Sequence, residues 1–431
     1  TTATSAKAKA SASVVGSGIS GKDLFTVAAN QSDIETATSK TASDYGAGFR
    51  LLDGTGLASN YTITSNSFAI TQRVLSSSGS RLYDATTTAS SSDLTLSNLI
   101  GSETLTLSGS GTLSDANVAD NKTVSLNTLS IADNTGLAAN YTLSGGTHQL
   151  TVNQRPLNAT LSRQYDGTTT SAGSDLSSFD ALQGGETLTL SGSGTSASAN
   201  VANGIAMSSN GNLALVDGTG LASNYSLNST VINITERVLN SSGSKIYDAN
   251  TDALAADITL SNLVSGEALN HSGTATISSA NAGSYTITNL AGITIADGSG
   301  GTASNYTLTG GTHNFTVNPK VVSIQGNKTY DGNTTISSGD ITSITDTVGA
   351  ETLVISSGSG TVSSANAATY ASAGINEGTL TLGNGTNGGL ASNYTLTGHA
   401  ASSFQVTQRV LSSSGSRIYD GSTTASSSDL T

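Results

Sequence analysis

The feature that most constrains this 431-residue chain is internal repetition. A Tyr-Asp pair recurs at intervals of 82, 82, 83 and 89 residues, and an Asn-Tyr pair recurs with similar spacing. Self-similarity at a nearly fixed period indicates a series of similar units, each with its own core, rather than one large core. The residues that define the repeat are Tyr83, Asp84, Tyr165, Asp166, Tyr247, Asp248, Tyr330, Asp331, Tyr419 and Asp420 in the first pair, and Asn60, Tyr61, Asn140, Tyr141, Asn224, Tyr225, Asn305, Tyr306, Asn393 and Tyr394 in the second.

Two further landmarks lie between those pairs, always in the same order. One is a glutamate that opens an alternation of Thr with apolar residues (Glu103, Glu186, Glu267, Glu351), and the other is an Ala-Asn pair (Ala116-Asn117, Ala199-Asn200, Ala280-Asn281, Ala365-Asn366). The landmarks predict a unit of about 82 residues, and the four complete units are named repeats 1 to 4 in chain order. The predicted boundaries are 1–73 (partial leading repeat), 74–154, 155–236, 237–318, 319–408 and 409–431 (partial trailing repeat).

The two ends of the chain are related to each other. Residues 407–431 differ from residues 71–95 at only three of 25 positions. The trailing segment carries a Tyr-Asp pair, whereas residues 1–73 carry the later landmarks of a unit without one. Two interpretations follow. The chain is a window of a longer array, which we favour, or it is a natural subunit whose tail completes the head of the next molecule by strand addition, giving a head-to-tail filament.

Within a unit the residue pattern has a period of two. Residues 103–107, 141–143 and 150–152 alternate polar or Thr positions with apolar ones, and clusters of Gly, Asn, Asp and Ser interrupt the runs. This pattern is typical of half-buried strands joined by turns. It predicts an all-β fold with six or seven short strands per unit and a brief helical turn near residues 92–99. The expected architecture is a linear tandem array of small β-sandwich-like repeats, with β-grasp-like modules as the alternative.

Composition excludes several classes of protein. With no cysteine, the chain has neither disulfides, thiol nucleophiles nor cysteine-bound metals. A net charge of −13 argues against nucleic acid and anionic lipid as partners. The sequence has no run of about 18 apolar residues, the pattern that predicts a membrane-spanning helix. Few prolines and many β-branched residues disfavour disorder.

The recurring tyrosines are expected to anchor the cores. Since the chain has no Trp and six Phe, tyrosine is its main large side chain. A ring buried at a fixed position of every unit, with its hydroxyl on a backbone partner, fits this role better than a platform on which sugars stack. The Asp of each Tyr-Asp pair is expected to accept local backbone N–H groups in an Asx-type turn. Because Ala follows it at Ala85 and Ala249, left-handed backbone is not expected to be obligatory there.

Catalytic and metal-binding constellations are not found. The histidines His148, His271, His313 and His399 have no metal-ligand spacing, and there is no G-x-S-x-G elbow. The recurring glutamate is expected to stand alone at an exposed strand end, not in a carboxylate pair. Three residues before each recurring Asp the chain has Arg or Lys, which we interpret as a cation seeking a partner rather than an isopeptide crosslink. We therefore predict no catalytic residue, no metal and no cofactor.

The motifs carry a family resemblance. The sequence R-V-L-[SN]-S-S-G-S-[RK]-x-Y-D-[GA]-x-T is followed by E-x-L-x-x-S, by [SD]-A-N and by [LT]-A-[SA]-N-Y-[TS]-[LI]. This series resembles the YDG-type repeat domains of large secreted bacterial adhesins, which are related to filamentous-haemagglutinin-like proteins exported by two-partner secretion. The resemblance covers essentially the whole chain. It implies a β-rich, non-enzymatic protein that is extracellular or on the bacterial cell surface, and it transfers no binding residue.

These observations predict a structural or adhesive stalk or fibre that supports cell adhesion or a biofilm matrix. Its expected partners are neighbouring repeats or copies of itself end to end, with surface glycans or matrix polysaccharide as further candidates. The main alternative is a carbohydrate-binding repeat array that uses exposed tyrosines and Asn/Thr-rich loops.

Overall fold

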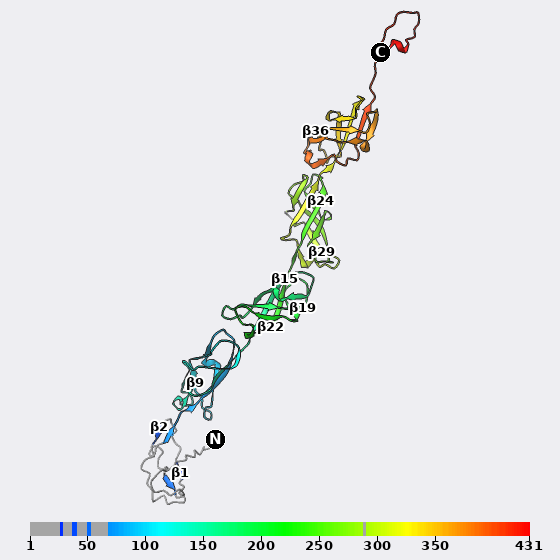
Figure 1. Cartoon of the computed structure of the whole chain (residues 1–431). Coiled ribbons are helices and arrows are strands. Elements are labelled where there is room, and N and C mark those ends of the chain that lie inside the picture. Colours follow the sequence, from blue (N-terminus) through cyan, green and yellow to red (C-terminus); the bar gives the residue numbers. More distant parts are fainter. Residues whose placement is uncertain (1–25, 29–36, 41–49, 53–67, 288–289) are drawn as a thin grey trace. The chain divides into compact units, whose positions relative to one another are not determined.

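A computed structural model of the chain describes residues 26–28, 37–40, 50–52, 68–287 and 290–431 (Figure 1). In these residues the regular structure consists of strands and one-turn 3-10 helices, without an α-helix. The all-β tandem array predicted from the repeat is therefore confirmed. No helix in the described part of the chain is long and apolar enough to cross a membrane. Before repeat 1 the strands are β1 (Thr26–Ala28), β2 (Ala37–Lys40), β3 (Arg50–Leu52) and β4 (Phe68–Ile70).

Repeat 1 is built on a four-stranded mixed sheet in the order β11-β14-β6-β8. Its first long strand, β6, pairs in parallel with its last strand, β14, and the other two pairings are antiparallel. Two-stranded ladders β7-β10, β9-β12 and β5-β13 complete the unit. The elements are β5 (Arg73–Val74), β6 (Ser76–Leu82), β7 (Thr88–Ser90), η3 (Ser91–Asp93), β8 (Leu94–Ser97), β9 (Thr106–Ser108), β10 (Ser110–Thr112), β11 (Ala119–Thr123), β12 (Ser130–Ala132), η4 (Ala138–Asn140), β13 (Tyr141–Thr142) and β14 (His148–Asn153).

Repeat 2 has a six-stranded sheet in the order β16-β19-β20-β22-β15-β17, with β18-β21 as a separate ladder. Here the region equivalent to β13 and β14 is one continuous strand, β22. The elements are β15 (Arg155–Gln164), β16 (Thr170–Ala172), η5 (Gly173–Asp175), β17 (Leu176–Phe179), β18 (Leu188–Ser191), β19 (Ser193–Ser196), β20 (Ala202–Ser209), β21 (Ala214–Asp217), η6 (Ala222–Asn224) and β22 (Tyr225–Thr235).

Repeat 3 returns to a four-stranded sheet, β26-β24-β31-β28, in which the first long strand β24 again pairs in parallel with the last strand β31. The ladders are β25-β27-β29 and β23-β30. The elements are β23 (Arg237–Val238), β24 (Asn240–Ile246), β25 (Asp252–Leu254), η7 (Ala255–Asp257), β26 (Ile258–Ser261), β27 (Leu269–Thr276), β28 (Gly283–Thr286), β29 (Ile293–Asp297), η8 (Ala303–Asn305), β30 (Tyr306–Thr307) and β31 (His313–Asn318).

Repeat 4 repeats this plan with the sheet β35-β33-β42-β38, the parallel pair β33-β42 and the ladders β34-β37-β39, β36-β40 and β32-β41. The elements are β32 (Lys320–Val321), β33 (Ser323–Thr329), β34 (Thr335–Ser337), η9 (Ser338–Asp340), β35 (Ile341–Thr345), β36 (Leu353–Ser357), β37 (Ser359–Val362), β38 (Ala368–Ala371), η10 (Ser372–Gly374), β39 (Ile375–Asn376), β40 (Thr381–Asn384), η11 (Ala391–Asn393), β41 (Tyr394–Thr395) and β42 (Ser403–Thr407). In the trailing segment the only regular element is η12 (Ser427–Asp429).

The core of each repeat is formed by alternate residues of its strands. In β14 every second side chain is buried, from His148 to Val152, as expected for a strand with one face inward. Leu150 and Val152 belong to the same apolar cluster as Ala89 of the β7-β10 ladder. The four-stranded sheet and the short ladders therefore share one core. This is a sandwich-like arrangement, and the described residues contain no helix that could cover a sheet as in a β-grasp module.

Two local predictions need correction. Repeat 1 has ten strands, β5 to β14, rather than six or seven. The number is higher because single residues break the alternating runs; β9 and β10, for example, are separated by Gly109 in left-handed conformation, with φ +79°. The predicted helical turn exists but is shorter and earlier than expected, because Asp93 accepts a hydrogen bond from the backbone N–H of Ser90 and the next strand begins at Leu94.

By its internal contacts the chain divides into two compact units, and the division runs through repeat 2. One contains residues 1–161, 170–197 and 206–232, and the other contains residues 162–169, 198–205 and 233–431. Each site below lies within one of these units and is described there. The repeat boundaries given above remain a prediction.

Candidate functional site at the repeat junctions

The recurring Tyr and Glu residues meet where one repeat follows another. Tyr83 of repeat 1 donates a hydrogen bond from its hydroxyl to Oε1 of Glu186 in repeat 2, at 2.6 Å. Tyr225 of repeat 2 donates to Oε2 of the same carboxylate, at 2.7 Å. The two rings lie edge to face with centroids 5.2 Å apart and an interplanar angle of 77°, a favourable geometry for aromatic pairs. One carboxylate thus joins a tyrosine from each repeat.

The same arrangement occurs at the next two junctions. In each, a Tyr-Asp tyrosine and the Asn-Tyr tyrosine of the following repeat share one glutamate, with O···O distances of 2.6–2.7 Å, centroids 5.3–5.4 Å apart and an interplanar angle of 78°. Three occurrences with nearly constant geometry make this a repeated device of the fold. The second junction consists of Tyr165, Glu267 and Tyr306, and the third of Tyr247, Glu351 and Tyr394.

The asparagine of each Asn-Tyr pair forms a second contact across the junction. The side chain of Asn224 accepts a hydrogen bond from the backbone N–H of Val118, at 2.9 Å, and donates one to Oδ1 of Asn117, at 3.0 Å. Asn224 is buried, and a buried amide is costly unless it is paired in this way. Asn305 pairs with Asn200, and Asn393 pairs with Asn281, in the same manner.

The environment of the junction holds its tyrosines in the neutral form. Burial raises the pKa of Tyr225 to about 12, and the hydrogen bond to Glu186 and the charge of that carboxylate act in the same direction. The same causes raise the pKa of Tyr306 and of Tyr247 to about 12. The pKa values of Tyr83 and Tyr394 are raised as well. A neutral phenol is required here, because only the protonated hydroxyl can donate to the carboxylate.

These contacts correct the prediction for the glutamate. It was expected to stand alone at an exposed strand end, but Glu186, Glu267 and Glu351 are half-buried and each accepts two tyrosine hydroxyls. The glycine Gly220 allows the close approach, because a Cβ atom there would lie 2.5 Å from Oε2 of Glu186. A sequence signal existed: the glutamate follows the Tyr-Asp tyrosine of the preceding repeat by 102 to 104 residues each time.

Seven of the recurring tyrosines are buried in the cores, but the expectation of a buried ring at this position of every unit is wrong for Tyr330 and Tyr419. The buried ones act between repeats as well as within them. The hydroxyls of Tyr225, Tyr306 and Tyr394 accept the predicted backbone hydrogen bonds, from the N–H groups of Gln183, Val264 and Val348. Tyr141 makes the corresponding contacts with Ile100 and Glu103 in repeat 1. Tyr330 is partly exposed and Tyr419 almost fully exposed. The predicted residues Asn60 and Tyr61 lie outside the described residues.

The Tyr-Asp turn has the predicted Asx geometry. Asp84 accepts a hydrogen bond from the backbone N–H of Thr86 at 2.9 Å, and Asp166, Asp248, Asp331 and Asp420 accept the equivalent one. The cation three residues earlier finds its partner in the same Asp, as in the Lys245–Asp248 ion pair at 2.8 Å. Equivalent ion pairs are Arg81–Asp84, Arg163–Asp166, Lys328–Asp331 and Arg417–Asp420.

The prediction that this turn does not need left-handed backbone is wrong. The residue after the Asp has a positive φ in all five copies, including Ala85 at 61° and Ala249 at 63°. The glycines Gly167, Gly332 and Gly421 have φ of 78–81°. An alanine in this region is strained by roughly 1 kcal/mol, so two copies tolerate strain rather than avoid it.

The histidines have structural partners. His148 is buried, with Nδ1 2.8 Å from the hydroxyl of Ser77 and Nε2 2.8 Å from the carbonyl oxygen of Leu143. His313 makes the same contacts with Ser241 and Leu308. Each ring therefore binds the loop that precedes the last strand of its repeat. Within the described part of the chain, no three His, Asp or Glu residues are grouped so that they could hold a metal ion.

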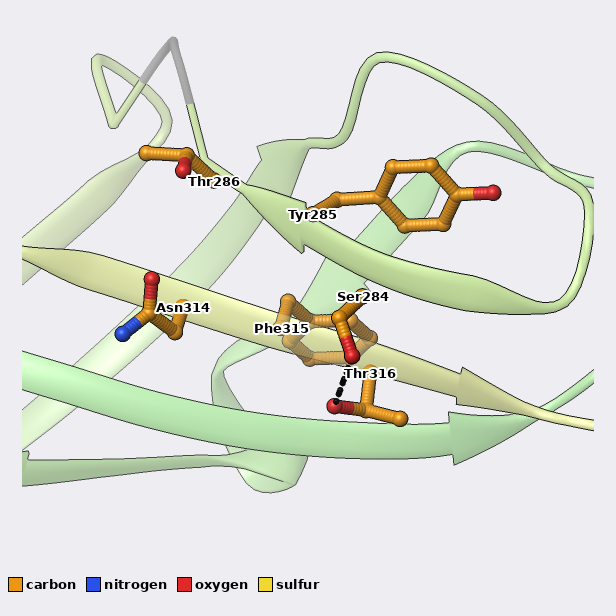
Figure 2. A pocket seen from close by; sticks show the side chains of 6 residues that line it. All are labelled: Ser284, Tyr285, Thr286, Asn314, Phe315 and Thr316. Carbon is orange, nitrogen blue, oxygen red and sulfur yellow. Dashed lines mark hydrogen bonds between the residues drawn. The ribbon is translucent and has the colours of Figure 1, made fainter.

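A shallow polar groove lies on strands β28 and β31 of repeat 3 (Figure 2). It has a volume of about 320 Å³ and is lined by Ser284, Tyr285, Thr286, Asn314, Phe315 and Thr316. Tyr285 donates its hydroxyl to the carbonyl oxygen of Asn281, and the ring of Phe315 is buried. The groove therefore offers hydroxyl and amide groups and one aromatic edge, without a pair of ionisable groups for acid–base chemistry.

These observations define a tandem-repeat all-β protein whose units are joined by their own recurring residues. The family model for the YDG domain matches residues 69–149, 147–232 and 235–314 in tandem. Since these ranges cover more than half of the sequence, the chain belongs to the YDG domain family. No curated protein matches the chain. Residues 319–408 lie outside the matched ranges, but Glu351, Asn393 and Tyr394 form the same junction there.

Proposed function

We propose that this chain is a non-enzymatic structural stalk of a bacterial surface adhesin, located outside the cell and supporting adhesion or a biofilm matrix. The observation that carries the proposal is the junction, in which a glutamate and an asparagine of one repeat bind a tyrosine and a backbone N–H of the repeat before it. A protein that serves as a spacer needs defined contacts between successive units, and these contacts recur three times.

The energetics of the junction support this role. At each junction one tyrosine hydroxyl from the preceding repeat donates to the glutamate, and a hydrogen bond to a charged group contributes about 1.5–3 kcal/mol. The edge-to-face aromatic pair across the junction adds about 0.5–1.5 kcal/mol. Together these contributions are a substantial fraction of the free energy of unfolding of a small domain, about 5–15 kcal/mol. Neighbouring repeats therefore stabilise each other, as in other linear repeat proteins.

The proposal is tested in the native host. Antibodies raised against this chain should label the surface of intact cells, and deletion of the gene should reduce attachment and biofilm mass. Re-expression of the wild-type gene should restore both. A variant with Glu186→Ala, Glu267→Ala and Glu351→Ala should be exported but restore attachment poorly, whereas Glu236→Ala, which removes an exposed glutamate outside the three junctions, should restore it fully. Label confined to the cytoplasm, or unchanged attachment after deletion, would contradict the proposal.

The polar groove in repeat 3 supports a second candidate, a carbohydrate-binding array. Its hydroxyl and amide groups suit a sugar, although the rings of six junction tyrosines are buried and unavailable for stacking. A glycan array probed with the full chain tests this candidate. Binding that is lost in Asn314→Ala and kept in a variant remote from the groove, Asn250→Ala, would support it. Absence of binding across the array would favour the spacer.

A further inference from the structure

The Tyr-Asp turn exists in two chemical versions. The residue three positions before the Asp is arginine in three turns and lysine in two. Where it is arginine, the residue two positions after the Asp is Thr or Ser, and where it is lysine, that residue is Asn. Lysine and asparagine therefore occur together in the same two of the five turns. The arginine turns contain Arg81 with Thr86, Arg163 with Thr168 and Arg417 with Ser422, and the lysine turns contain Lys245 with Asn250 and Lys328 with Asn333.

In repeat 3 the lysine, the asparagine and the aspartate of this turn contact one another. Nζ of Lys245 lies 2.7 Å from Oδ1 of Asn250 and 2.8 Å from Oδ1 of Asp248. The other carboxylate oxygen of Asp248 accepts a hydrogen bond from Nδ2 of Asn250, at 2.8 Å. One carboxylate thus contacts both the amine of the lysine and the amide nitrogen of the asparagine. Because a C=O bond is about 1.2 Å long, Cγ of Asn250 lies within about 4 Å of the amine.

The lysine amine is held at this place by the backbone. Nζ of Lys245 also donates to the backbone carbonyl oxygens of Asn250 and Asp252, at 2.9 Å and 2.8 Å. Its side chain is only 8% exposed. Groups that are kept side by side in this way react as though they were present at a very high concentration.

The second lysine turn, in repeat 4, has the same arrangement. Nζ of Lys328 lies 3.0 Å from Oδ1 of Asn333 and 3.1 Å from Oδ1 of Asp331. The backbone carbonyl oxygens of Asn333 and Thr335 accept from the same amine, and the lysine side chain is 5% exposed. The geometry is therefore a property of the lysine version of the turn and is present twice.

We propose that each of these lysines forms an isopeptide bond with its asparagine, Lys245 with Asn250 and Lys328 with Asn333, without the help of another protein. Nζ of the lysine attacks Cγ of the asparagine, the Nζ–Cγ bond forms, and the bond from Cγ to Nδ2 breaks. Of the three protons of the lysine ammonium group, one remains on the new amide and two leave with Nδ2, which departs as an ammonium ion. Oδ1 remains the carbonyl oxygen of the new amide, and no oxidant, reductant or other reactant is consumed.

The aspartate carries the protons in this reaction. Oδ1 of Asp248 is placed to accept a proton from the lysine, which frees the lone pair of the nitrogen for attack. Oδ2 is placed at the leaving nitrogen, to which the carboxyl group returns the proton. A carboxyl group that contacts both the nucleophile and the leaving group is suited to general acid–base catalysis.

The arginine turns cannot react in this way. A guanidinium group remains protonated and offers no amine, and the Thr or Ser opposite it has no acyl group. The interpretation of this position as a cation with a partner therefore holds for the arginine turns, and the isopeptide bond is confined to the two lysine turns.

The bond in repeat 3 encloses a junction residue. Lys245 and Asn250 lie on either side of Tyr247, whose hydroxyl binds Glu351 of the next repeat. A covalent link between residues 245 and 250 restricts the backbone of the turn, so that less conformational entropy is lost when the tyrosine is placed at the junction. The turn would then be held closed even when the hydrogen bonds of the junction open.

Mass spectrometry of the intact, full-length chain tests the proposal. Each bond releases one ammonia, so the wild-type chain should be lighter than its sequence mass by about 17 Da for each bond and about 34 Da in all. Fragmentation should give branched peptides that join Lys245 to Asn250 and Lys328 to Asn333. A wild-type mass equal to the sequence mass would overturn the proposal.

Substitutions in repeat 3 test the roles of the residues, with the bond in repeat 4 as an internal reference. Lys245→Arg, which introduces the residue of the other turns, should abolish the mass loss in repeat 3 only. Asp248→Asn should do the same, although both reacting residues remain. The matched control is Asp252→Ala, which removes an exposed carboxylate from a residue that contacts Lys245 through its backbone oxygen; it should keep both losses.

Two results of this series would contradict the mechanism. A mass loss in repeat 3 that persists in Lys245→Arg would identify a reaction of an asparagine alone, such as succinimide formation, and would overturn the proposal. A branched peptide that forms as readily in Asp248→Asn would overturn the role of the aspartate.

A transplant into repeat 2 tests whether the three residues are sufficient. This repeat already has Asp166 between Arg163 and Thr168, with an ion pair to the arginine. The double variant Arg163→Lys with Thr168→Asn should lose a third ammonia, whereas each single variant should not. Absence of the third loss in the double variant would overturn the assignment of the reaction to these three residues.

The inference goes beyond the proposed function and does not depend on it. The masses are measured on the purified chain, wherever the cell places it. A chain without isopeptide bonds that labels the cell surface and supports attachment remains a stalk, and a chain with both bonds that is confined to the cytoplasm retains the chemistry without the adhesin role.

Discussion

Residues 71–95 and 407–431 are nearly the same sequence in two different environments. Both contain the Asx turn, the Arg–Asp ion pair and a 3-10 turn whose third residue is Asp. In the first segment Leu75 is 0% exposed and Tyr83 is 3% exposed; in the second, Leu411 and Tyr419 are 86% and 91% exposed. The turn and ion pair are therefore properties of the segment itself. Burial and strand pairing come from the rest of the repeat and from the repeat that follows.

The largest expected effect is at the apolar position that is buried in one segment, as Leu75, and exposed in the other, as Leu411. Leu75→Ala should lower the free energy of unfolding by about 2–5 kcal/mol, because it leaves a cavity in a packed core. Leu411→Ala should change it by less than about 0.5 kcal/mol, because the side chain is in solvent. Denaturant unfolding followed by circular dichroism measures both. A comparable loss from the two variants would contradict the difference in burial between Leu75 and Leu411.

The second prediction concerns the two tyrosines. Tyr83→Phe removes a hydrogen bond to the carboxylate of Glu186 and should cost about 1.5–3 kcal/mol. Tyr419→Phe should be neutral, because this side chain is almost fully exposed to solvent. The same unfolding experiment applies, with Tyr285→Phe as a variant outside the junctions. If Tyr83→Phe were neutral, the shared carboxylate would not stabilise the junction.

The third prediction concerns the pH dependence of stability at the junction. The pKa of Tyr225 is raised from 10.0 to about 12. The folded protein stabilises the neutral form of Tyr225. The contribution of this group to the free energy of unfolding is therefore complete below pH 10, declines as the pH rises towards 12 and is lost above it. The unfolding midpoint of the wild-type chain should therefore fall steeply across that window. Tyr225→Phe should have a lower midpoint at neutral pH and a shallower fall; an unchanged slope would contradict the assignment.

The smallest expected change in stability concerns the residue after the Asp of the Tyr-Asp pair. This is one of the three positions at which the two segments differ, with Ala85 in the first and Gly421 in the second. Both occupy left-handed backbone, and Ala249 repeats the alanine with an exposed side chain. Ala249→Gly should stabilise repeat 3 by about 0.5–1 kcal/mol through relief of strain. The reverse control, Gly332→Ala, should destabilise repeat 4 by a similar amount, because its new Cβ would meet no atom within 4 Å and only the backbone is strained. Thermal unfolding resolves both, and the same sign of shift in both would contradict this account.

The sequence predicts the elements of the fold better than the contacts between repeats. Alternation of apolar residues predicted strands, and Asp followed by a small residue predicted the Asx turn, because both depend on neighbours a few residues away. The role of Glu186 depends on Tyr83, 103 residues earlier, and nothing local distinguishes that glutamate from an exposed one. The left-handed backbone at Ala85 cannot be predicted from its residue type, because alanine rarely adopts positive φ; the turn imposes this conformation at a cost.

The parallel pairing of the first and last strands has a mechanical consequence. When a chain is pulled from its two ends, tension enters repeat 1 at the start of β6 and leaves it at the end of β14. Because these strands lie side by side in parallel, with six residue pairs in register from Ser77↔His148 to Leu82↔Asn153, the load slides one strand along the other. The hydrogen bonds between them are then sheared together rather than opened one after another, and rupture requires more force than the unzipping of a hairpin of equal length.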